Sequence, residues 1–410
     1  MLVAIALAGF AVRVAYALVA NVPHGFGDDL WYHQVANGLI DGRGFSDPFN
    51  SLVNGSVTFG QSGDPIATAF HLPLFPALLS VFSAVGLDSY TAHQIVGCAL
   101  GAGTVFVVGL IGARLGGART AYATAGIAAI FLPLVTRDAL LMSESLYGLL
   151  IALALLATLR LREQPSARRA LALGVVIGLA ALTRSEALLL VLLLAAPLRQ
   201  WRNFALVCAA VAVICVPWAL RNSLEFDQPT ALTTGDGSVL AGANLGSTYH
   251  GRLLGGWDPD GLFRTEAGQR VDPNEAVQSD RWRSDGWRYI KAHPGRLAVV
   301  LPVRLLRTAD LYPLDPRDHA AFASDYYNHI RALEYLAQAM LLVVIVLAAL
   351  GARRLRPLWP FLAPLVLVAL VSLAGYGDPR FRQAADVSLV VMAGAAVAGM
   401  KGRPWKLLSR

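Results

Sequence analysis

Long apolar runs are the feature that most constrains this chain. Of its 410 residues, 56% are apolar and 15% are charged, whereas an ordinary soluble domain has about 25% charged residues. A helix that crosses a bilayer needs about 20 mostly apolar residues. Ten windows approach this length: Leu2–Val19, Thr91–Ala113, Thr120–Val135, Ser145–Leu159, Ala170–Leu182, Ala187–Leu198, Phe204–Ala219, Leu333–Leu350, Leu358–Ala374 and Val387–Met400. The sequence therefore predicts an all-α integral membrane protein with about ten transmembrane helices, and it excludes a soluble enzyme or a disordered chain.

Basic residues are concentrated in alternate loops. With the N-terminus inside, five segments lie inside: Arg114–Arg119, Arg160–Arg169, Arg199–Arg202, Arg353–Arg356 and Lys401–Arg410. Together they hold fifteen Lys and Arg residues and one acid, Glu163. Because cytoplasmic loops carry excess basic residues, we expect a multi-pass protein of the cytoplasmic (inner) membrane with both termini in the cytoplasm. This sorting explains the net charge of +7 without a nucleic-acid partner.

The first predicted span contains a charged residue, Arg13. A guanidinium at mid-bilayer is costly, so Arg13 should face protein or a polar cavity. The span also lacks the basic leader of a signal peptide, so we expect it to be retained.

An eleventh apolar run, Phe70–Leu87, has two prolines near its start. If it crossed the membrane, Arg114 and Arg119 would lie outside, so we interpret it as an interfacial helix. The chain then divides into a membrane module over 1–220 with a first outer loop at 21–90, a mixed outer segment over 221–331, and C-terminal transmembrane helices over 332–410.

Two adjacent carboxylates, Asp28 and Asp29, follow the first span directly. Like charges this close raise the pKa of one of them, which suits a general base for a hydroxyl nucleophile. Alternatively, one of the two caps an amphipathic surface helix that runs through Leu39. The sequence leaves both interpretations open.

Further ionisable residues stand at the predicted outer ends of other spans. His71 precedes the interfacial helix and would lie at headgroup depth, or in a solvated loop. Arg137 and Glu144 are seven residues apart, two helical turns, so they can share a face with Asp138 nearby. The alternative for these charges is ordinary snorkelling at the interface.

Four arginines complete this outer set. Arg184 lies in a polar turn with Glu186 and either pairs with that acid or binds substrate. Arg221 ends the seventh predicted span, and Arg380 and Arg382 flank an aromatic before the last one. A guanidinium fork matches phosphate, although lipid headgroups also attract interfacial arginines. Acids and arginines at one membrane boundary suit a phosphate-bearing lipid.

In their order along the chain, these pieces resemble the GT-C glycosyltransferases that use polyprenyl-phosphate sugars. More narrowly, they are similar to the bacterial branch related to protein mannosyltransferases and aminoarabinose transferases. The resemblance rests on Asp28-Asp29 with Tyr32, His71-Leu72-Pro73-Leu74-Phe75-Pro76, Arg137 to Glu144, Leu182-Thr183-Arg184-Ser185-Glu186, Pro217-Trp218 to Arg221-Asn222, and Arg380-Phe381-Arg382. It covers most of the chain and implies a GT-C-like bundle with interfacial helices in the first outer loop.

The resemblance also implies roles for these residues. The family's first-loop acid, taken as the base, corresponds to Asp28 with Asp29 as its neighbour, where the family often has Asp-Glu. Its second essential carboxylate corresponds to Glu144, with Asp138 as the alternative. The family often has a further proline where Leu72 stands. Substrate-binding roles fall on Tyr32, His71, Arg137, Asp138, Arg184, Arg221, Arg380 and Arg382.

The implied reaction is transfer of a sugar from a polyprenyl-phosphate donor, with inversion, at the outer membrane face. The acceptor is a glycolipid, a polysaccharide or a protein, and membrane lipids surround the enzyme. Five aromatic residues of the outer segment are candidates for acceptor contacts: Tyr249, Trp257, Trp282, Trp287 and Tyr289. The alternative is that they mark the membrane interface, where Trp and Tyr are enriched. No compact metal cluster is visible, so we expect no required cofactor, with a divalent cation at Asp28 and Asp29 as the alternative.

Two other classes of protein remain as alternatives. A secondary transporter or lipid flippase should carry polar residues at the bilayer midplane and show repeat symmetry. A membrane scaffold would not need acids and arginines in six separated segments. The placement of nearly all these groups at one boundary favours the transferase.

Overall fold

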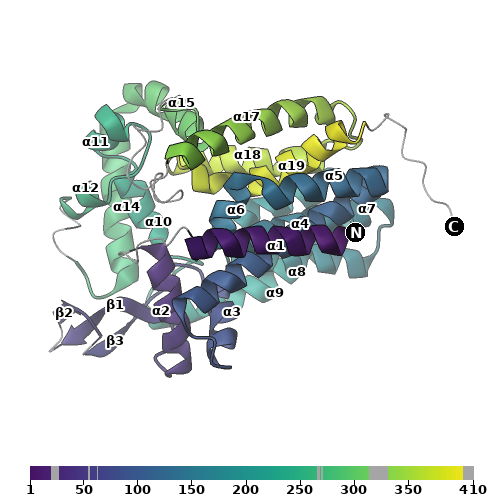
Figure 1. Ribbon diagram of the computed structural model, residues 1–410. Helices are drawn as coiled ribbons and strands as arrows, with labels where there is room; N and C mark the ends of the chain where they lie inside the picture. Colours follow the sequence, from purple (N-terminus) through teal and green to yellow (C-terminus); the bar gives the residue numbers. More distant parts are fainter. Residues whose placement is uncertain are drawn as a thin grey trace.

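The computed structural model describes residues 1–19, 27–53, 56–61, 63–265, 268, 271–313 and 331–399. Long helices form a bundle, with the start of α1 (Leu2–Val19) and the end of α19 (Gln383–Val397) at one end and the strands and short helices at the other (Figure 1). We call the second end the loop end. The predicted inner segment Lys401–Arg410 lies outside the described residues.

The bundle contains most of the predicted apolar windows as helices. They are α1 (Leu2–Val19), α4 (Tyr90–Gly116), α5 (Ala118–Ile130), α6 (Leu132–Ala139), α7 (Glu144–Glu163), α8 (Ala167–Ala181), α9 (Trp201–Glu225), α17 (Arg331–Ala352), α18 (Trp359–Ala374) and α19 (Gln383–Val397). Within the described chain, five helices are long and apolar enough to cross a membrane, or six if the bent pair α5 and α6 is one span. The protein is thus a helical membrane protein, as predicted. The count of about ten spans is not confirmed, because α8, α18 and α19 have only 15 or 16 residues.

Two predicted windows are not straight helices. The window Ala187–Leu198 forms three short turns: η1 (Ser185–Leu188), η2 (Val191–Ala195) and η3 (Ala196–Leu198). Pro197 lacks a backbone N–H and ends any regular helix there. The window Thr120–Val135 bends by 57° between α5 and α6. Pro133 causes this break, because its ring would clash with the carbonyl group four residues earlier in a continuous helix.

The segment after α1 builds one side of the loop end. It contains α2 (Asp28–Ile40), β1 (Ser46–Val53), β2 (Ser56–Phe59), β3 (Asp64–Ala67) and α3 (Leu74–Ser83), with the strands in the antiparallel order β2-β1-β3. At ten residues, α3 is too short to span a bilayer, as the interfacial interpretation requires. Gly27 is the N-cap residue of α2, and no side chain caps this helix. The interpretation of Asp28 or Asp29 as a helix cap is therefore wrong.

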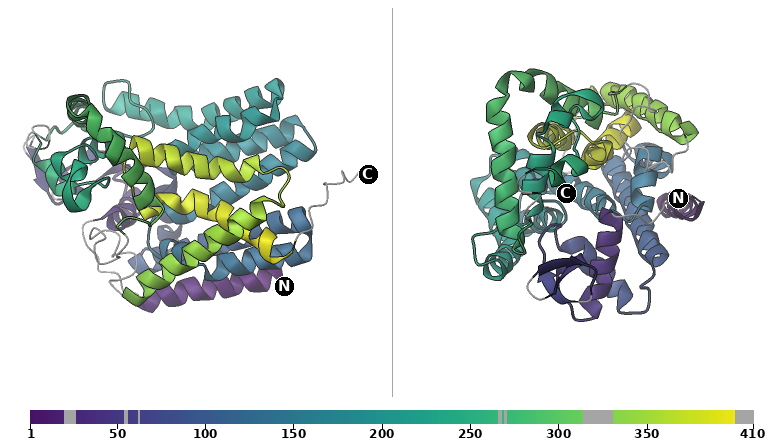
Figure 2. Two further views of the ribbon diagram at one scale, coloured as in Figure 1. Left: turned by 90° about the horizontal axis from the view of Figure 1, so that it is seen from above. Right: turned by 90° about the vertical axis from the view of Figure 1, so that its left-hand side faces the viewer.

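The described part of the predicted outer segment is helical and contains no strand. It comprises α10 (Gly235–Gly242), α11 (Gly246–Tyr249), η4 (Gly251–Leu253), α12 (Pro259–Phe263), α14 (Glu275–Ala292), η5 (Pro294–Arg296) and α15 (Leu297–Thr308). Seen from the loop end, these helices and the α2–α3 segment flank the end of the bundle (Figure 2).

A buried carboxylate joins these two segments. Glu275 Oε2 accepts hydrogen bonds from the Ala69 amide at 2.6 Å and Thr234 Oγ1 at 2.7 Å, and its Oε1 accepts one from Thr68 Oγ1 at 2.8 Å. Arg221 belongs to the same junction, because its guanidinium donates to the carbonyl oxygens of Thr68 and Phe45. The junction fixes the walls of the space between the segments.

Candidate active site

A cavity of about 1460 Å³ opens at the loop end, between α2, α7, η1, α10, α15, α18 and η7 (Pro379–Arg382). Ligand pockets commonly measure about 300–1,000 Å³, so this one has room for two substrates. Seven of the predicted site residues line it: Asp28, Asp29, Tyr32, His71, Glu144, Arg184 and Arg380. The predicted convergence of separated segments thus holds for these seven.

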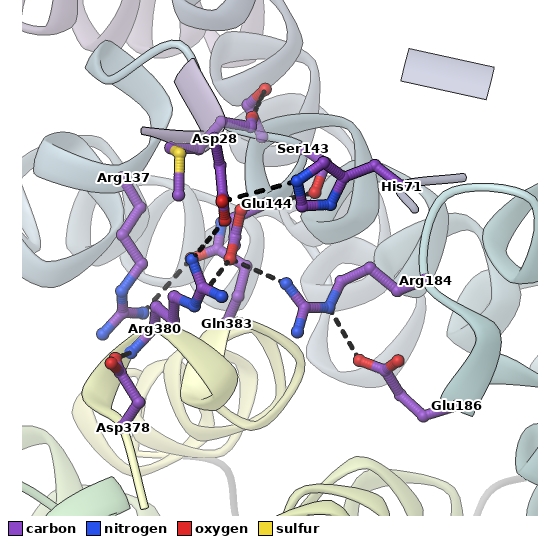
Figure 3. A network of polar contacts seen from close by, with 12 residues as sticks. Asp28, His71, Arg137, Ser143, Glu144, Arg184, Glu186, Asp378, Arg380 and Gln383 are labelled. Atoms are coloured by element: carbon purple, nitrogen blue, oxygen red, sulfur yellow. Dashed lines mark hydrogen bonds and ion pairs between the residues drawn. The ribbon is translucent and has the colours of Figure 1, made fainter. Parts of the chain in front are cut away.

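Asp28 is an accessible carboxylate of the cavity, with its side chain 29% exposed. Arg380 donates from Nη1 to Asp28 Oδ2 at 2.6 Å, and His71 Nε2 lies 3.4 Å from Oδ1 (Figure 3). Burial alone would raise the pKa of Asp28. The charges of Arg380 and His71 outweigh burial and hold that pKa well below its usual range. Asp28 is therefore an ionised carboxylate at neutral pH.

Glu144 is nearly inaccessible, at 2% exposure, and it orders two arginines. Arg184 donates from Nη1 to Glu144 Oε1 at 2.7 Å and from Nε to Glu186 Oε1 at 2.7 Å. Arg380 Nε lies 4.0 Å from the same Glu144 oxygen. Arg184 therefore does pair with Glu186, but the same guanidinium also connects α7 to the turn after α8. We call Asp28, Glu144, Glu186, Arg184 and Arg380 the carboxylate cluster.

Tyr32 supports His71 from the next turn of α2. Its ring centroid lies 5.0 Å from that of His71, and its hydroxyl donates to Ser143 Oγ at 3.2 Å. Burial, followed by the charges of Asp28 and Glu144, raises the pKa of Tyr32 above its usual value. Tyr32 thus stays protonated and holds the imidazole beside Asp28.

Asp29 does not join the cluster. Its Oδ2 accepts a hydrogen bond of 2.6 Å from the Tyr90 hydroxyl at the start of α4. Among the described residues, no group of three His, Cys, Asp or Glu side chains is placed to hold a metal ion. A cation at Asp28 and Asp29 would have to displace Arg380 and His71 from Asp28.

Four predicted site residues do not line the cavity. Arg221 lies in the Glu275 junction described above. Arg137 and Arg382 donate to the two oxygens of Asp386 at 2.6 and 2.9 Å, and Asp138 accepts from Arg13 at 2.8 Å. These ionic groups are buried between helices, where charges need partners. Arg13 thus faces protein, as expected, and these four residues have structural partners rather than cavity contacts.

Sequence reasoning missed several cavity residues. Tyr376 accepts a hydrogen bond from Arg380 Nη2 at 3.2 Å and stacks on Trp257 with ring centroids 6.1 Å apart. Asp378 accepts from the Arg380 amide at 2.8 Å, and burial raises the pKa of Asp378. Both residues stand within four positions of the predicted Arg380, and this closeness in the sequence could have indicated them as site residues. Of the five predicted outer-segment aromatics, Trp257 and Trp287 line the cavity, whereas Tyr249, Trp282 and Tyr289 do not. Two further arginines, Arg304 and Arg307, also line it.

Comparisons with known proteins agree with this architecture. Residues 70–220 match the family model described as dolichyl-phosphate-mannose-protein mannosyltransferase. This segment contains His71, Glu144 and Arg184 of the site. No curated protein matches the chain.

Solved structures resemble the whole chain in fold. The archaeal oligosaccharyltransferase AglB from Archaeoglobus fulgidus, in complex with an inhibitory peptide and a dolichol-phosphate, is 15% identical with a TM-score of 0.50, over 95% of this chain and 50% of that one. The apo form of the Archaeoglobus fulgidus oligosaccharyltransferase is 17% identical with a TM-score of 0.51, over 96% and 50%. ArnT from Cupriavidus metallidurans bound to undecaprenyl phosphate is 15% identical with a TM-score of 0.42, over 95% and 77%.

This chain spans about half the length of the oligosaccharyltransferase chains that it matches. Over 95% of its residues the chain therefore shares the fold of the archaeal oligosaccharyltransferase, in agreement with the predicted GT-C-like bundle, and residues 70–220 match the mannosyltransferase family model.

Proposed function

We propose that this protein is a membrane glycosyltransferase that uses a polyprenyl-phosphate-linked sugar as donor. The observation that carries the proposal is the Asp28 carboxylate, which lies in a two-substrate cavity beside Arg380 and His71. The related AglB structure contains a dolichol-phosphate, and the family model names a dolichyl-phosphate mannose donor, which agrees with this donor class. The acceptor class is a glycolipid, a polysaccharide or a protein.

The proposed reaction is a single displacement. Asp28 accepts the proton of an acceptor hydroxyl, whose oxygen attacks the anomeric carbon of the donor sugar. The bond from that carbon to the phosphate oxygen breaks with inversion, and polyprenyl phosphate leaves. Cationic donors around the leaving oxygen stabilise its developing charge. Arginines that line the described site, such as Arg380, can supply this charge.

Arg380 links the two halves of this reaction. In the donor-free cavity it is bound to Asp28 and makes that carboxylate a weak base, because a low pKa reduces its affinity for a proton. A phosphate in the cavity competes with Asp28 for the guanidinium. Donor binding then raises the pKa of Asp28 and activates the base only when the leaving group is in place.

We place the catalytic membrane module in residues 1–220 and the reaction at the outer face of the cytoplasmic membrane, with both termini inside. The basic loops support this orientation. Arg114 and Glu163, from two of the predicted inner segments, form a bidentate ion pair with contacts of 2.7–3.0 Å. These segments therefore meet on one side of the bundle.

The test is sugar consumption by membranes that contain the full chain. Candidate polyprenyl-phosphate sugars, mannose- and aminoarabinose-linked among them, are offered to wild type, Asp28→Asn and Asp29→Asn. We expect Asp28→Asn to slow transfer by about 10²–10⁴-fold, the usual contribution of a general base, and Asp29→Asn to be milder. Asp41→Asn, an exposed acid just after α2, is the matched control and should retain wild-type activity. Wild-type rates in Asp28→Asn would refute the assignment of the base.

A further inference from the structure

Two arginines on α15 form a second group of charges in the cavity. Arg304 and Arg307 are three residues apart, so they lie on neighbouring positions of one helix face. Both line the cavity and are otherwise buried, with exposures of 2% and 6%. Leu301 and Leu297, about one and two turns before Arg304, line the cavity from the same helix. We call Arg304 and Arg307 the arginine pair.

Among the described residues, no carboxylate is ion-paired with either member of the arginine pair. Arg304 donates to the carbonyl oxygens of Leu373 at 3.0 Å and Ala243 at 2.8 Å and to Asn244 Oδ1 at 3.0 Å, and its buried Nε has no hydrogen-bond partner. Arg307 donates from Nε to the Leu254 carbonyl oxygen at 2.6 Å. Their neutral partners orient the two guanidinium groups without cancelling their charge.

The other cavity arginines are different in this respect. Arg184 and Arg380 belong to the carboxylate cluster, where three carboxylates face two guanidinium groups. Arg283 pairs with Asp236 at 3.0 Å. The charge of Asp378 acts on Arg307 without an ion pair. An anion entering the cavity therefore meets guanidinium groups that no described carboxylate pairs with at the arginine pair, and guanidinium groups already paired with carboxylates at the carboxylate cluster.

The arginine pair also adjoins the carboxylate cluster. The loop that leads to Arg380 packs directly on α15: a Cβ on Gly377 would lie 2.3 Å from the Arg304 carbonyl oxygen and 2.7 Å from Arg307 Cβ. This close approach permits no side chain at position 377. A ligand held by the arginine pair therefore lies next to the loop that carries Arg380.

We propose that Arg304 and Arg307 form a phosphate-binding subsite of the cavity, for a phosphate that is carried on an apolar chain. The inference rests on the proposed function and names a ligand site within it. The leucines of α15 supply the apolar wall beside the charge. Two sources share this chemistry: the polyprenyl phosphate of the donor, and a phosphate on a lipid acceptor.

The charge of the subsite persists at neutral pH. Burial lowers the pKa of Arg304 to about 10 and also lowers that of Arg307, but both guanidinium groups remain protonated at pH 7. Any change in phosphate affinity between pH 7 and 8 should therefore follow the ionisation of the phosphate and not that of the arginine pair.

The test uses the purified full chain in detergent micelles, titrated with inorganic phosphate and, separately, with undecaprenyl phosphate. Affinity is measured for wild type, Arg304→Lys and Arg307→Gln. We expect each variant to bind inorganic phosphate at least about tenfold more weakly, the effect of one lost charge-assisted hydrogen bond. Arg296→Gln is the matched control, because Arg296 donates to the Tyr249 carbonyl oxygen at 2.9 Å but does not line the cavity. Thermal unfolding without ligand confirms that each variant is folded.

Competition distinguishes the two sources. If saturating undecaprenyl phosphate displaces inorganic phosphate, the subsite holds the donor phosphate; if both bind together, it serves the acceptor. Folded arginine-pair variants that bind both probes as tightly as wild type would overturn the subsite. Wild type that binds phosphate through the pair but consumes no polyprenyl-phosphate sugar would instead refute the proposed function alone.

Discussion

Arg380 is the residue on which the proposed chemistry depends most directly. Its guanidinium contacts Asp28 at 2.6 Å and Tyr376 at 3.2 Å, and its Nε approaches Glu144 at 4.0 Å. Burial raises the pKa of Tyr376 to about 12, so this phenol is a neutral partner of Arg380. Of these three groups, Asp28 is the one that a donor phosphate must replace.

Removing Arg380 should change the pH dependence of transfer. In wild type the pKa of Asp28 lies below the ordinary value near 3.9, so the acid limb of kcat/KM should lie below about pH 4. In Arg380→Gln the pKa of Asp28 rises, and we expect an acid limb to appear above about pH 4, where the wild-type profile is flat, while kcat falls. The measurement is a kcat/KM profile from pH 4 to 8.

The control is Arg283→Gln, which removes a cavity arginine that pairs with Asp236 and not with Asp28. Its acid limb should coincide with that of wild type. Equal limbs in Arg380→Gln and wild type would show that Arg380 does not set the protonation of Asp28. The same ion pair stabilises the folded chain at neutral pH, because the folded pKa is below the unfolded one, and this stability is lost only as the pH falls through the folded pKa.

At the scale of helices, close contacts through glycine hold the bundle together. A Cβ on Gly351 of α17 would lie 1.8 Å from the Met392 carbonyl oxygen of α19, and one on Gly174 of α8 would lie 2.6 Å from the Val207 carbonyl oxygen of α9. In lipid the hydrophobic effect does not drive helices together, so their association depends on close van der Waals packing. Small residues allow the backbones of neighbouring helices to approach closely. These glycines therefore set the spacing of neighbouring helices.

Gly351→Ala should destabilise the bundle, because the added methyl group meets backbone that cannot move aside. We expect a loss of roughly 1–3 kcal/mol, typical of overpacking, seen as a lower midpoint of thermal unfolding in detergent. Gly126→Ala in α5 is the control, since a Cβ there meets no atom within 4 Å. If both variants unfold at the wild-type temperature, α17 and α19 are not packed as described.

At the scale of the whole molecule, a chain of buried polar groups connects distant segments. Arg13 of α1 binds Asp138 of α6, and Gln383 of α19 donates to that same carboxylate at 3.2 Å. Asp386 belongs to the same network of buried polar groups and accepts a hydrogen bond from Arg382. Arg382 in turn donates to the Thr308 carbonyl oxygen of α15 at 3.0 Å. This buried network includes Arg382 and therefore holds η7 in place. The same η7 carries Arg380, which contacts Asp28.

Breaking this chain at Arg13 should destabilise the whole protein. Arg13→Leu leaves Asp138 as a buried carboxylate without its main partner, and the loss should be about 3–5 kcal/mol. The double variant Arg13→Leu with Asp138→Leu should recover part of it, because no unpaired charge remains. Thermal unfolding of the three proteins checks this, and an additive double variant would contradict the coupling.

Local sequence determined the elements. The first window, Leu2–Val19, is the helix observed, and α9, α17 and α18 begin or end within a few residues of their predicted limits. Apolar runs fix helices because their backbone must be satisfied internally in lipid. The windows Thr120–Val135 and Ala187–Leu198 are not the continuous helices predicted. In each, a proline interrupts the backbone hydrogen bonds over a few residues, and a hydropathy window does not contain this information.

Tertiary structure alone decided which charges share the cavity. Asp28 and Arg380 are 352 positions apart, whereas Arg382, two residues further on, points into the buried network. Both arginines precede the last helix in the same motif, and only the direction of each side chain on η7 distinguishes them. For the same reason, the sequence does not predict Arg304 and Arg307 as site residues. Whether a carboxylate forms an ion pair with them depends on which segments the fold brings beside α15. Local patterns set hydrogen bonding along a helix, but ion pairs between distant segments depend on how those helices pack.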